Sequence, residues 1–220
     1  MRRSWLLLLL LPGLLLAGDF LATLRSLEPK VVATYGERAG RRLNAWQQLI
    51  GEQQGQDERA QLSAVNDFFN LFQYVDDQSL WGRNDYWATP IEFIGAAAGD
   101  CEDYTIAKYF SLLELGVPED KMRLTYVKAT QLNQYHMVLA YYPSQGAAPL
   151  ILDNLIGEIK PATERGDLLP IYSFNGTRLW LAKERGRGEL VGKSSRLSLW
   201  NDLNSRFRVR SLKRPLLTMD

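Results

Sequence analysis

The sequence has very little cysteine: Cys101 is the only one among its 220 residues. One cysteine cannot form an intrachain disulfide, so a fold held together by disulfide bridges is excluded. This thiol lies in the segment GDCEDYTIAKY, residues 99–109, with Asp100, Glu102 and Asp103 beside it. Negatively charged neighbours disfavour the thiolate, which is the reactive form of cysteine. Either Cys101 is inert, or something in this segment offsets the negative charge.

The sequence also lacks an excess of one charge, an internal repeat and a low-complexity tract after its leader. Its formal net charge is +1, which gives no electrostatic reason to expect a nucleic acid as partner. Charged residues make up 23% and hydrophobic residues 46%, a composition that argues against wholesale disorder. A chain of 220 residues then suits one sizeable globular domain, with at most a small appendage.

The N-terminal apolar run is too short for a confident membrane span, which needs ~20 residues. It reads MRRSWLLLLLLPGLLLAGDF, with two arginines first, an apolar core from Trp5 to Leu16, and then Ala17 and Gly18. This order is typical of a secretory signal peptide, so we expect residues 1–18 to be one. An uncleaved N-terminal anchor is the alternative. A lone thiol in an oxidising compartment is a liability unless it is buried or used.

Helical spacing comes first along the chain and strand-like patterns come later. Residues 20–75 look helical, most clearly over 45–54 and 61–75, and residues 101–115 read as a helix that begins at Cys101. The stretch 76–98 between them is rich in Gly, Pro, Asn and Asp and is expected to be irregular. Strand-like runs follow at 122–129, 135–142, 148–155 and 170–182, the last as a hairpin around Asn175-Gly176.

This order predicts an α+β fold with a largely antiparallel sheet. We place the main domain at residues 19–192. The basic segment 193–220 is expected to be a solvated terminal helix or tail, with a docking surface for an acidic partner as the alternative.

The chain's one cysteine and one histidine stand at informative places. Cys101 begins a helix, whose N-terminal partial positive charge lowers the pKa of a thiol. His136 lies in an alternating strand, and the face it shares with Val138 and Ala140 is expected to point toward the core or an adjoining helix. Asp153 closes the next strand-like run, where adjacent strands could bring its carboxylate beside the imidazole. The pattern suggests a thiol nucleophile, an imidazole base and an orienting carboxylate.

Each of these three residues also has an ordinary structural interpretation. A lone cysteine is often a small buried apolar residue, and a lone histidine on a strand is often structural. An aspartate that ends a strand often serves turn chemistry, and the neighbouring Asn154 is a rival to Asp153 as the orienting group. The local pattern alone leaves these alternatives open.

The acidic residues beside the cysteine have two interpretations. In the first, Asp100 is an N-cap whose side chain accepts a free amide of the first turn, while Glu102 and Asp103 interact favourably with the helix dipole. In the second, these carboxylates bind a hard cation such as calcium, which takes ~6–8 oxygen ligands. Three side chains are too few, so the preceding loop would add ligands from Asn84, Asp85 or backbone carbonyls.

The segment GDCEDYTIAKY, followed by YHMVLAYY and LILDNL, resembles the bacterial transglutaminase-like cysteine proteases. The longer run WATPIEFIGAAAGDCEDYTIAKYFSLLELGVPEDKMRLTYVK strengthens the resemblance, which covers residues 35 to 185. It implies a papain-like or transglutaminase-like α+β fold, with an N-terminal helical part packed on the sheet and the nucleophile at a helix N-terminus. It also implies Cys101 as nucleophile, His136 as base and Asp153 as the orienting residue.

Within that family the chain is similar to the periplasmic proteases that release adhesins. This implies a calcium-dependent endopeptidase that cuts a large surface adhesin near its N-terminus, at an Ala-Ala-type site, and so promotes biofilm dispersal. It implies calcium as cofactor, with Asp100, Glu102 and Asp103 as the matching acidic residues. It further implies an inner-membrane cyclic-di-GMP receptor as inhibitory partner. Transglutaminase-type acyl transfer and peptidoglycan peptide cleavage are alternatives that use the same triad, and a non-enzymatic binding module is a third.

Overall fold

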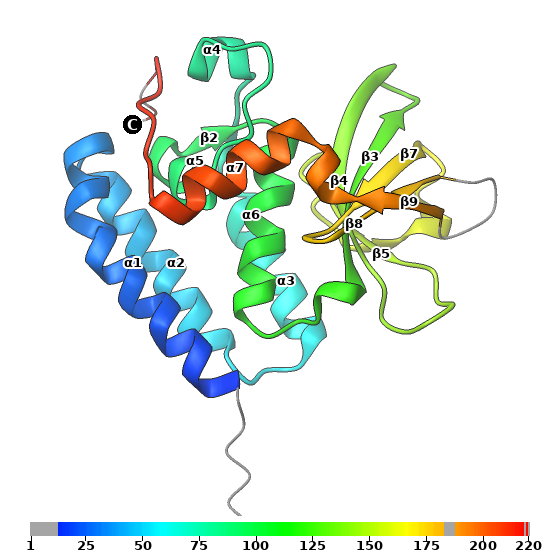
Figure 1. Ribbon diagram of the computed structural model, residues 1–220, viewed down its shortest axis with the longest axis horizontal. Helices are drawn as coiled ribbons and strands as arrows, with labels where there is room; N and C mark the ends of the chain where they lie inside the picture. Colours follow the sequence, from blue (N-terminus) through cyan, green and yellow to red (C-terminus); the bar gives the residue numbers. More distant parts are fainter. Residues whose placement is uncertain (1–12, 183–187, 218, 220) are drawn as a thin grey trace, which may run out of the picture.

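The computed structural model describes residues 13–182, 188–217 and 219, and it has the expected α+β architecture. Figure 1 shows a helical layer beside a sheet, with helix α6 (Cys101–Glu114) between them. Helix α6 contacts strands β3 and β4 on one side and helices α3 and α5 on the other. The three N-terminal helices are α1 (Gly13–Tyr35), α2 (Glu37–Gln53) and α3 (Glu58–Phe69). The helix that begins at Cys101 is therefore the central element of the fold.

Helices α2 and α3 form because apolar residues recur at helical spacing and bury one stripe. In α2 the fully buried residues include Leu43, Trp46 and Ile50, as the sequence pattern of 45–54 predicted. Helix α3 begins at an aspartate cap, Asp57, whose carboxylate accepts the Ala60 amide at 2.9 Å. The expected helix over 61–75 ends earlier, at Phe69, because the chain then enters the short parallel pair of β1 (Gln73–Tyr74) and β2 (Ala98–Gly99).

The large sheet has seven strands in the order β6-β5-β4-β3-β7-β8-β9, and every neighbouring pair is antiparallel. Its strands are β3 (Met122–Ala129), β4 (Gln134–Tyr141), β5 (Leu150–Leu152), β6 (Lys160–Pro161), β7 (Leu168–Phe174), β8 (Arg178–Leu181) and β9 (Glu189–Lys193). The hairpin around Asn175-Gly176 is confirmed, since Asn175 Oδ1 accepts the Thr177 and Arg178 amides. The run 148–155 forms only the short strand β5.

The expectation of an irregular stretch at 76–98 is wrong. This stretch contains helices α4 (Asp77–Trp81) and α5 (Pro90–Ala96), and every residue of α5 is buried. Helix α5 begins with a capping box, in which Thr89 Oγ1 accepts the Glu92 amide and the Glu92 carboxylate accepts the Thr89 amide. Proline at the first helical position fits the same motif. The sequence T-P-I-E was therefore a helix start that the Gly and Pro content concealed.

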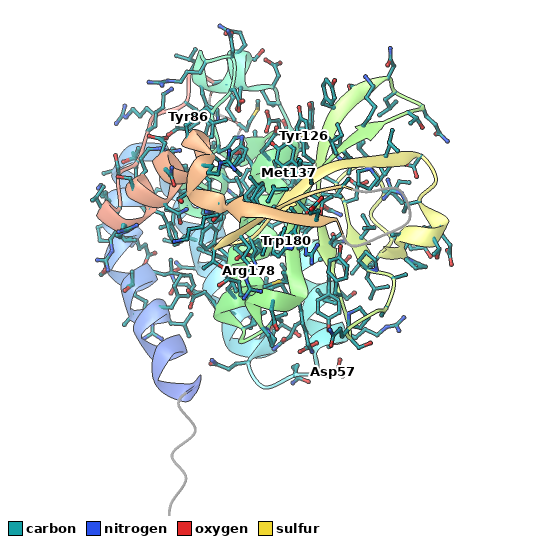
Figure 2. All side chains as sticks on the ribbon, turned by 45° about the vertical axis from the view of Figure 1, so that its right-hand side comes forward. Asp57, Tyr86, Tyr126, Met137, Arg178 and Trp180 are labelled. Atoms are coloured by element: carbon teal, nitrogen blue, oxygen red, sulfur yellow. The ribbon has the colours of Figure 1, made fainter. Side chains whose placement is uncertain are left out.

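The two faces of strand β4 contact different clusters. Met137 and Leu139 belong to the main core, together with residues of α6, and Figure 2 labels Met137 where the strand meets the helices. Val138 and Ala140 belong instead to a smaller cluster with Val127 of β3. Val138 and Ala140 therefore face a hydrophobic core as expected, but it is this smaller cluster and not the one that contains α6.

The basic C-terminal segment contains a helix, as one of the two expectations had it, but one face of this helix is buried rather than solvated. It forms helix α7 (Ser198–Val209), which crosses in front of α6 in Figure 1 and buries Trp200 and Leu203 against the core. Arg206 of this helix pairs with the fully buried Glu92 at 2.6 Å. The arginines made the segment look solvent-exposed, whereas one of them is the partner of a buried carboxylate.

The expected signal peptide falls largely on residues 1–12, which lie outside the described residues. No helix within the part of the chain that the structure describes combines the length and the apolar composition that a membrane span requires. The assignment of residues 1–18 as a signal peptide stays a prediction.

Candidate active site

Cys101 is the first residue of α6, where the sequence pattern placed it. Asp100 occupies the N-cap position, and Asp103 reaches back so that its carboxylate accepts the Asp100 amide at 3.3 Å and the Ala88 amide at 2.7 Å. Gly99 is required before the cap, because a Cβ there would lie 2.3 Å from the Asp103 carboxylate. These contacts fix the start of α6 and leave the Cys101 side chain 7% exposed.

His136 and Asp153 are in direct contact, although 17 residues separate them. His136 Nε2 lies 2.7 Å from Asp153 Oδ1, and both side chains are almost fully buried. The histidine comes from β4, and the aspartate directly follows β5, which pairs with β4. Since an ionised carboxylate only accepts hydrogen bonds, Nε2 carries the proton and Nδ1 is left as an acceptor.

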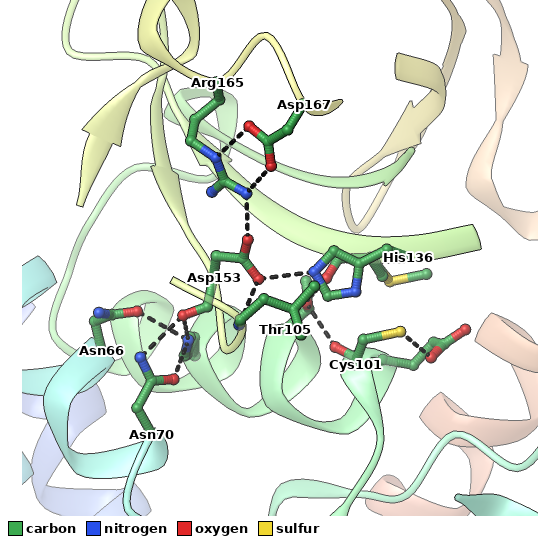
Figure 3. A network of polar contacts seen from close by, with 12 residues as sticks. Asn66, Asn70, Cys101, Thr105, His136, Asp153, Arg165 and Asp167 are labelled. Carbon is green, nitrogen blue, oxygen red and sulfur yellow. Dashed lines mark hydrogen bonds and ion pairs between the residues drawn. The ribbon is translucent and has the colours of Figure 1, made fainter. Parts of the chain in front are cut away.

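Helix α6 crosses β4 so that the start of the helix lies beside Met137, the residue that follows His136. Thr105 Oγ1, one turn after Cys101, donates to the carbonyls of Cys101 at 2.8 Å and Met137 at 3.0 Å. The Met137 amide is in turn a hydrogen-bond partner of the Cys101 sulfur. Figure 3 shows the free ring nitrogen of His136 facing Cys101. The structure therefore pairs His136 with Asp153 and places Cys101 near them, while their roles as nucleophile, base and orienting residue stay predictions.

Arg165 and Asp167 lie next to the His136–Asp153 pair. We call these four residues, His136, Asp153, Arg165 and Asp167, the triad cluster. Arg165 Nη2 donates to Asp153 Oδ2 and to Asp167 Oδ2, each at 2.8 Å (Figure 3). Burial alone would raise the pKa of Asp153, but its hydrogen bonds to His136, Leu155 and Arg165 outweigh burial and lower that pKa to about 2. The sequence gave no signal for Arg165, because a lone arginine in a loop has no distinguishing pattern.

On its other side Cys101 meets an acidic cluster, made of Asp77, Asp100, Glu102 and Asp103. Ligand atoms of Asp100, Cys101 and Glu102 lie within 4.8 Å of one another, and so do those of Asp77, Asp100 and Asp103. The three predicted metal residues therefore come together, and Asp77 joins them. Sequence reasoning missed Asp77 because it follows Asp76, the N-cap of α4, and reads as part of that helix start.

The carboxylates of the acidic cluster have no cation among the described side chains. Burial and the negative charges of Asp103, Glu102 and Asp77 raise the pKa of Asp100 to about 12. Burial is also the main cause that raises the pKa of Asp77 to about 7. The Oδ1 atoms of Asp77 and Asp100 are buried and have no hydrogen-bond partner. An all-oxygen donor set with two such unpaired atoms fits a hard divalent cation such as calcium.

The members of the acidic cluster differ in how free they are to bind an ion. Both oxygens of Asp103 already accept backbone amides, so this residue mainly builds the helix start. Asp100 and Asp77 each keep an unpaired oxygen, and Glu102 Oε2 accepts the Cys101 thiol at 2.8 Å. Asp100 is at the N-cap position in a capping box with Asp103, but its Oδ1 atom has no hydrogen-bond partner and is available as a ligand.

The charge of the acidic cluster acts directly on the thiol. Burial, and then the carboxylates of Glu102 and Asp100, raise the pKa of Cys101 well above its usual value. The helix N-terminus and the Met137 amide act in the opposite direction. In the protein without a cation, the thiol therefore stays protonated, and positive charge at the acidic cluster would favour the thiolate.

Comparison with known proteins places the chain in a family. The sequence profile of a family described as bacterial transglutaminase-like cysteine proteinases matches residues 32–174. EGTA-treated LapG of Legionella pneumophila is 42% identical, with a TM-score of 0.76, and the match covers 84% of this chain and 96% of LapG. Calcium-bound LapG of the same organism is 42% identical, with a TM-score of 0.74, and the match covers 85% of this chain and 98% of LapG. A search of curated proteins finds no match.

Proposed function

Since the chain belongs to the bacterial transglutaminase-like cysteine proteinase family, we propose that it is a calcium-dependent periplasmic endopeptidase that cleaves a large surface adhesin. Cys101 is the nucleophile, His136 the base and Asp153 the residue that orients the imidazole. The observation that carries this proposal is the His136–Asp153 contact of 2.7 Å, with the free ring nitrogen turned toward a thiol at a helix start (Figure 3).

The reaction uses these groups in sequence. Nδ1 of His136 takes the proton of the Cys101 thiol, and the thiolate attacks the scissile carbonyl. The backbone amide of Cys101, at the start of α6, is a donor for the oxyanion that forms. The imidazolium, stabilised by the ionised Asp153, then gives its proton to the leaving amine. Water attacks the resulting thioester and releases the second product.

Asp77, Asp100 and Glu102 would hold the calcium ion. A bound calcium ion supplies positive charge beside the thiol, which lowers the free energy of the thiolate. The unpaired oxygens of Asp77 and Asp100 support this assignment, and one solved relative is described as calcium-bound. Asp103 contributes by holding Asp100 and the helix start in place.

The adhesin substrate, its cleavage near the N-terminus and the resulting biofilm dispersal are the finer part of the proposal. They are supported by the resemblance of the GDCEDY segment to adhesin-releasing proteases. The same resemblance supports an inner-membrane cyclic-di-GMP receptor as the inhibitory partner.

The test is incubation of the purified protein with the N-terminal segment of a large adhesin from the same genome, with EGTA or with calcium. We expect cleavage with calcium, none with EGTA, and a loss of roughly 10³-fold or more in Cys101→Ala and His136→Ala, which should keep native circular dichroism.

Other outcomes would point elsewhere. Incorporation of an amine into a glutamine-bearing protein without chain cleavage would indicate a transglutaminase. Cleavage of purified peptidoglycan peptides but not of the adhesin would indicate a cell-wall peptidase. A Cys101 that resists alkylation with calcium at neutral pH would indicate a binding module. Cleavage that is insensitive to EGTA would indicate that the acidic cluster serves helix capping and not calcium binding.

A further inference from the structure

One stripe of helix α6 contains one member of the proposed triad and bonds to the main chain at, or next to, the other two. Cys101, Thr105 and Lys108 are spaced by four and three residues, so they share one face of the helix. Cys101 is the proposed nucleophile, and Thr105 bonds to the carbonyl of Met137, the residue after His136. Lys108 bonds to the carbonyl of Asp153. The third of these contacts is the unexpected one, because it places a lysine in the interior of the protein.

The Lys108 ammonium group is fully enclosed by neutral acceptors. Its side chain is 1% exposed, and Nζ donates to Asn66 Oδ1 at 2.8 Å, Asn70 Oδ1 at 2.8 Å and the Asp153 carbonyl at 3.1 Å. Asn70 Nδ2 donates to the same Asp153 carbonyl at 2.9 Å (Figure 3). Burial lowers the pKa of Lys108 to about 7. An apolar side chain here would avoid the cost of burying a cation, so stability alone does not account for lysine.

We propose that Lys108 is a positioning residue for the triad: with Asn70 it fixes the main chain of Asp153, so that the carboxylate keeps the His136 imidazole in its reactive tautomer. This inference rests on the proposed function, since it assigns Lys108 to the support of His136 and Asp153.

The physical reason is that Asp153 is held from two directions. His136, Arg165 and the Leu155 amide hold its carboxylate. Lys108 and Asn70 hold its carbonyl. Fixing the carbonyl restricts rotation about the Cα–C bond and so sets the direction of the Cα–Cβ bond, and only two side-chain torsions then separate the main chain from the carboxylate plane. Without the two donors the chain after β5 can rotate, and the 2.7 Å contact to His136 loosens.

The composition of the chain makes a direct test possible, because His136 is its only histidine and Cys101 its only cysteine. The ring nitrogens of His136 give a single set of NMR signals, and alkylation reports on Cys101 alone. The test variant is Lys108→Met, which removes the three N–H donors while keeping an unbranched side chain. The control is Ser111→Ala, three residues further along α6, where a buried hydroxyl bonds to Trp46 Nε1 and the Ala107 carbonyl but not to the triad.

In Lys108→Met we expect the ring-nitrogen shifts of His136 to move toward a mixture of tautomers, with loss of the downfield Nε2 proton. With calcium, kcat should fall about 10- to 100-fold at nearly constant KM. Ser111→Ala should lower the melting temperature but keep the His136 signals and kcat. If Lys108→Met keeps native His136 signals and merely unfolds at a lower temperature, as the control does, Lys108 is structural and the proposal is wrong.

A milder variant covers the case in which Lys108→Met does not fold. Asn70→Ala removes one donor to the Asp153 carbonyl and one acceptor for Lys108, at a partly exposed position. It should shift the His136 signals in the same direction by a smaller amount, and unchanged signals would overturn the proposal. Because NMR needs no substrate, this result is independent of whether the protein cleaves an adhesin, so the two proposals can fail separately.

Discussion

Cys101 lies between two buried polar clusters that differ in how completely their charges are paired. In the triad cluster, Arg165 joins two carboxylates and His136 completes the shell of Asp153, so that the pKa of Asp153 falls to about 2. In the acidic cluster, carboxylates face one another, and burial with that repulsion raises the pKa of Asp100 to about 12. Two aspartates on opposite sides of one thiol therefore differ in protonation: Asp153 favours its ionised form, and Asp100 favours its protonated form.

This difference shows which part of the site the chain completes by itself. The triad cluster is assembled and paired by protein groups, so its geometry is available as soon as the chain folds. The acidic cluster is strained by its own charge and would be relieved by a cation or a proton. If Cys101 is the nucleophile, as proposed, its histidine and aspartate partners are in place once the chain folds, while the protonation state of the thiol depends on added positive charge.

Removing the arginine of the triad cluster should have the largest effect on stability. Arg165→Met leaves Asp153 Oδ2 buried without its cation, which should cost about 3–5 kcal/mol. The pKa of Asp153 lies below its unfolded value of 3.8, so its contribution is present above pH 3.8 and is lost as the pH falls toward about 2. The deficit of the variant in urea unfolding should therefore be large at pH 6 and smaller at pH 3.

The matched control for this prediction is Arg178→Met, which removes an exposed arginine of β8 and should change stability by about 0.5 kcal/mol or less. A deficit of Arg165→Met that is the same at both pH values would contradict the pairing described for Asp153.

Neutralising a carboxylate of the acidic cluster should instead increase the stability of the protein. In EGTA, Asp100→Asn removes repulsion and should raise the melting temperature, by about 2–4 °C for each kcal/mol relieved. The pKa of Asp100 is raised, so the repulsion costs stability above pH 3.8 and the advantage of the variant should vanish below it. Calcium should raise the melting temperature of the wild type but not of the variant.

Asp67→Asn, at an exposed position of α3, is the control and should behave like the wild type in both EGTA and calcium. An Asp100→Asn protein that is less stable than the wild type in EGTA would show that this carboxylate is not under repulsion.

The smallest effect is expected at a lone carboxylate on the same helix. Burial raises the pKa of Glu114, near the end of α6, to about 7 without a charged neighbour. Its carboxylate therefore costs stability as the pH rises from 4.5 through 7, and Glu114→Gln should be slightly more stable at pH 8, by about 0.5 kcal/mol or less. At pH 5 the two proteins should melt together. A gain as large as that of Asp100→Asn would mean that burial, rather than repulsion, dominates the acidic cluster.

Local pattern was enough to predict the start of α6, strands β3 and β4 and the hairpin after β7, because each has a signal within a few residues. It also drew attention to Cys101 and His136, which are unique in the chain, but it left Asn154 as a rival to Asp153, and only the family resemblance favoured Asp153. It could not find Arg165 or Lys108, whose partners come from distant strands and helices. Their roles depend on where the sheet and α6 cross, which no local spacing encodes.

Other errors of the sequence analysis concerned features that do have a local sequence signal, which a second local feature outweighed. The capping box at Thr89 was hidden by the Gly and Pro around it, and tertiary packing made α5 a buried helix. The arginines of α7 suggested a solvated helix, although their long stems can cover apolar surface and a guanidinium group can pair with a buried carboxylate. Asp77 was overlooked because its neighbour explained the helix start.

The contact of Arg206 with Glu92 also bears on the order in which the protein becomes active. Arg206 bonds to the Glu92 carboxylate in α5 and to the Trp87 carbonyl just before that helix, both more than 100 residues earlier in the chain. A nascent chain that ends before α7 already contains every member of the proposed triad, but it leaves Glu92 buried without its cationic partner. Completion of the polypeptide and completion of the site are therefore tied together.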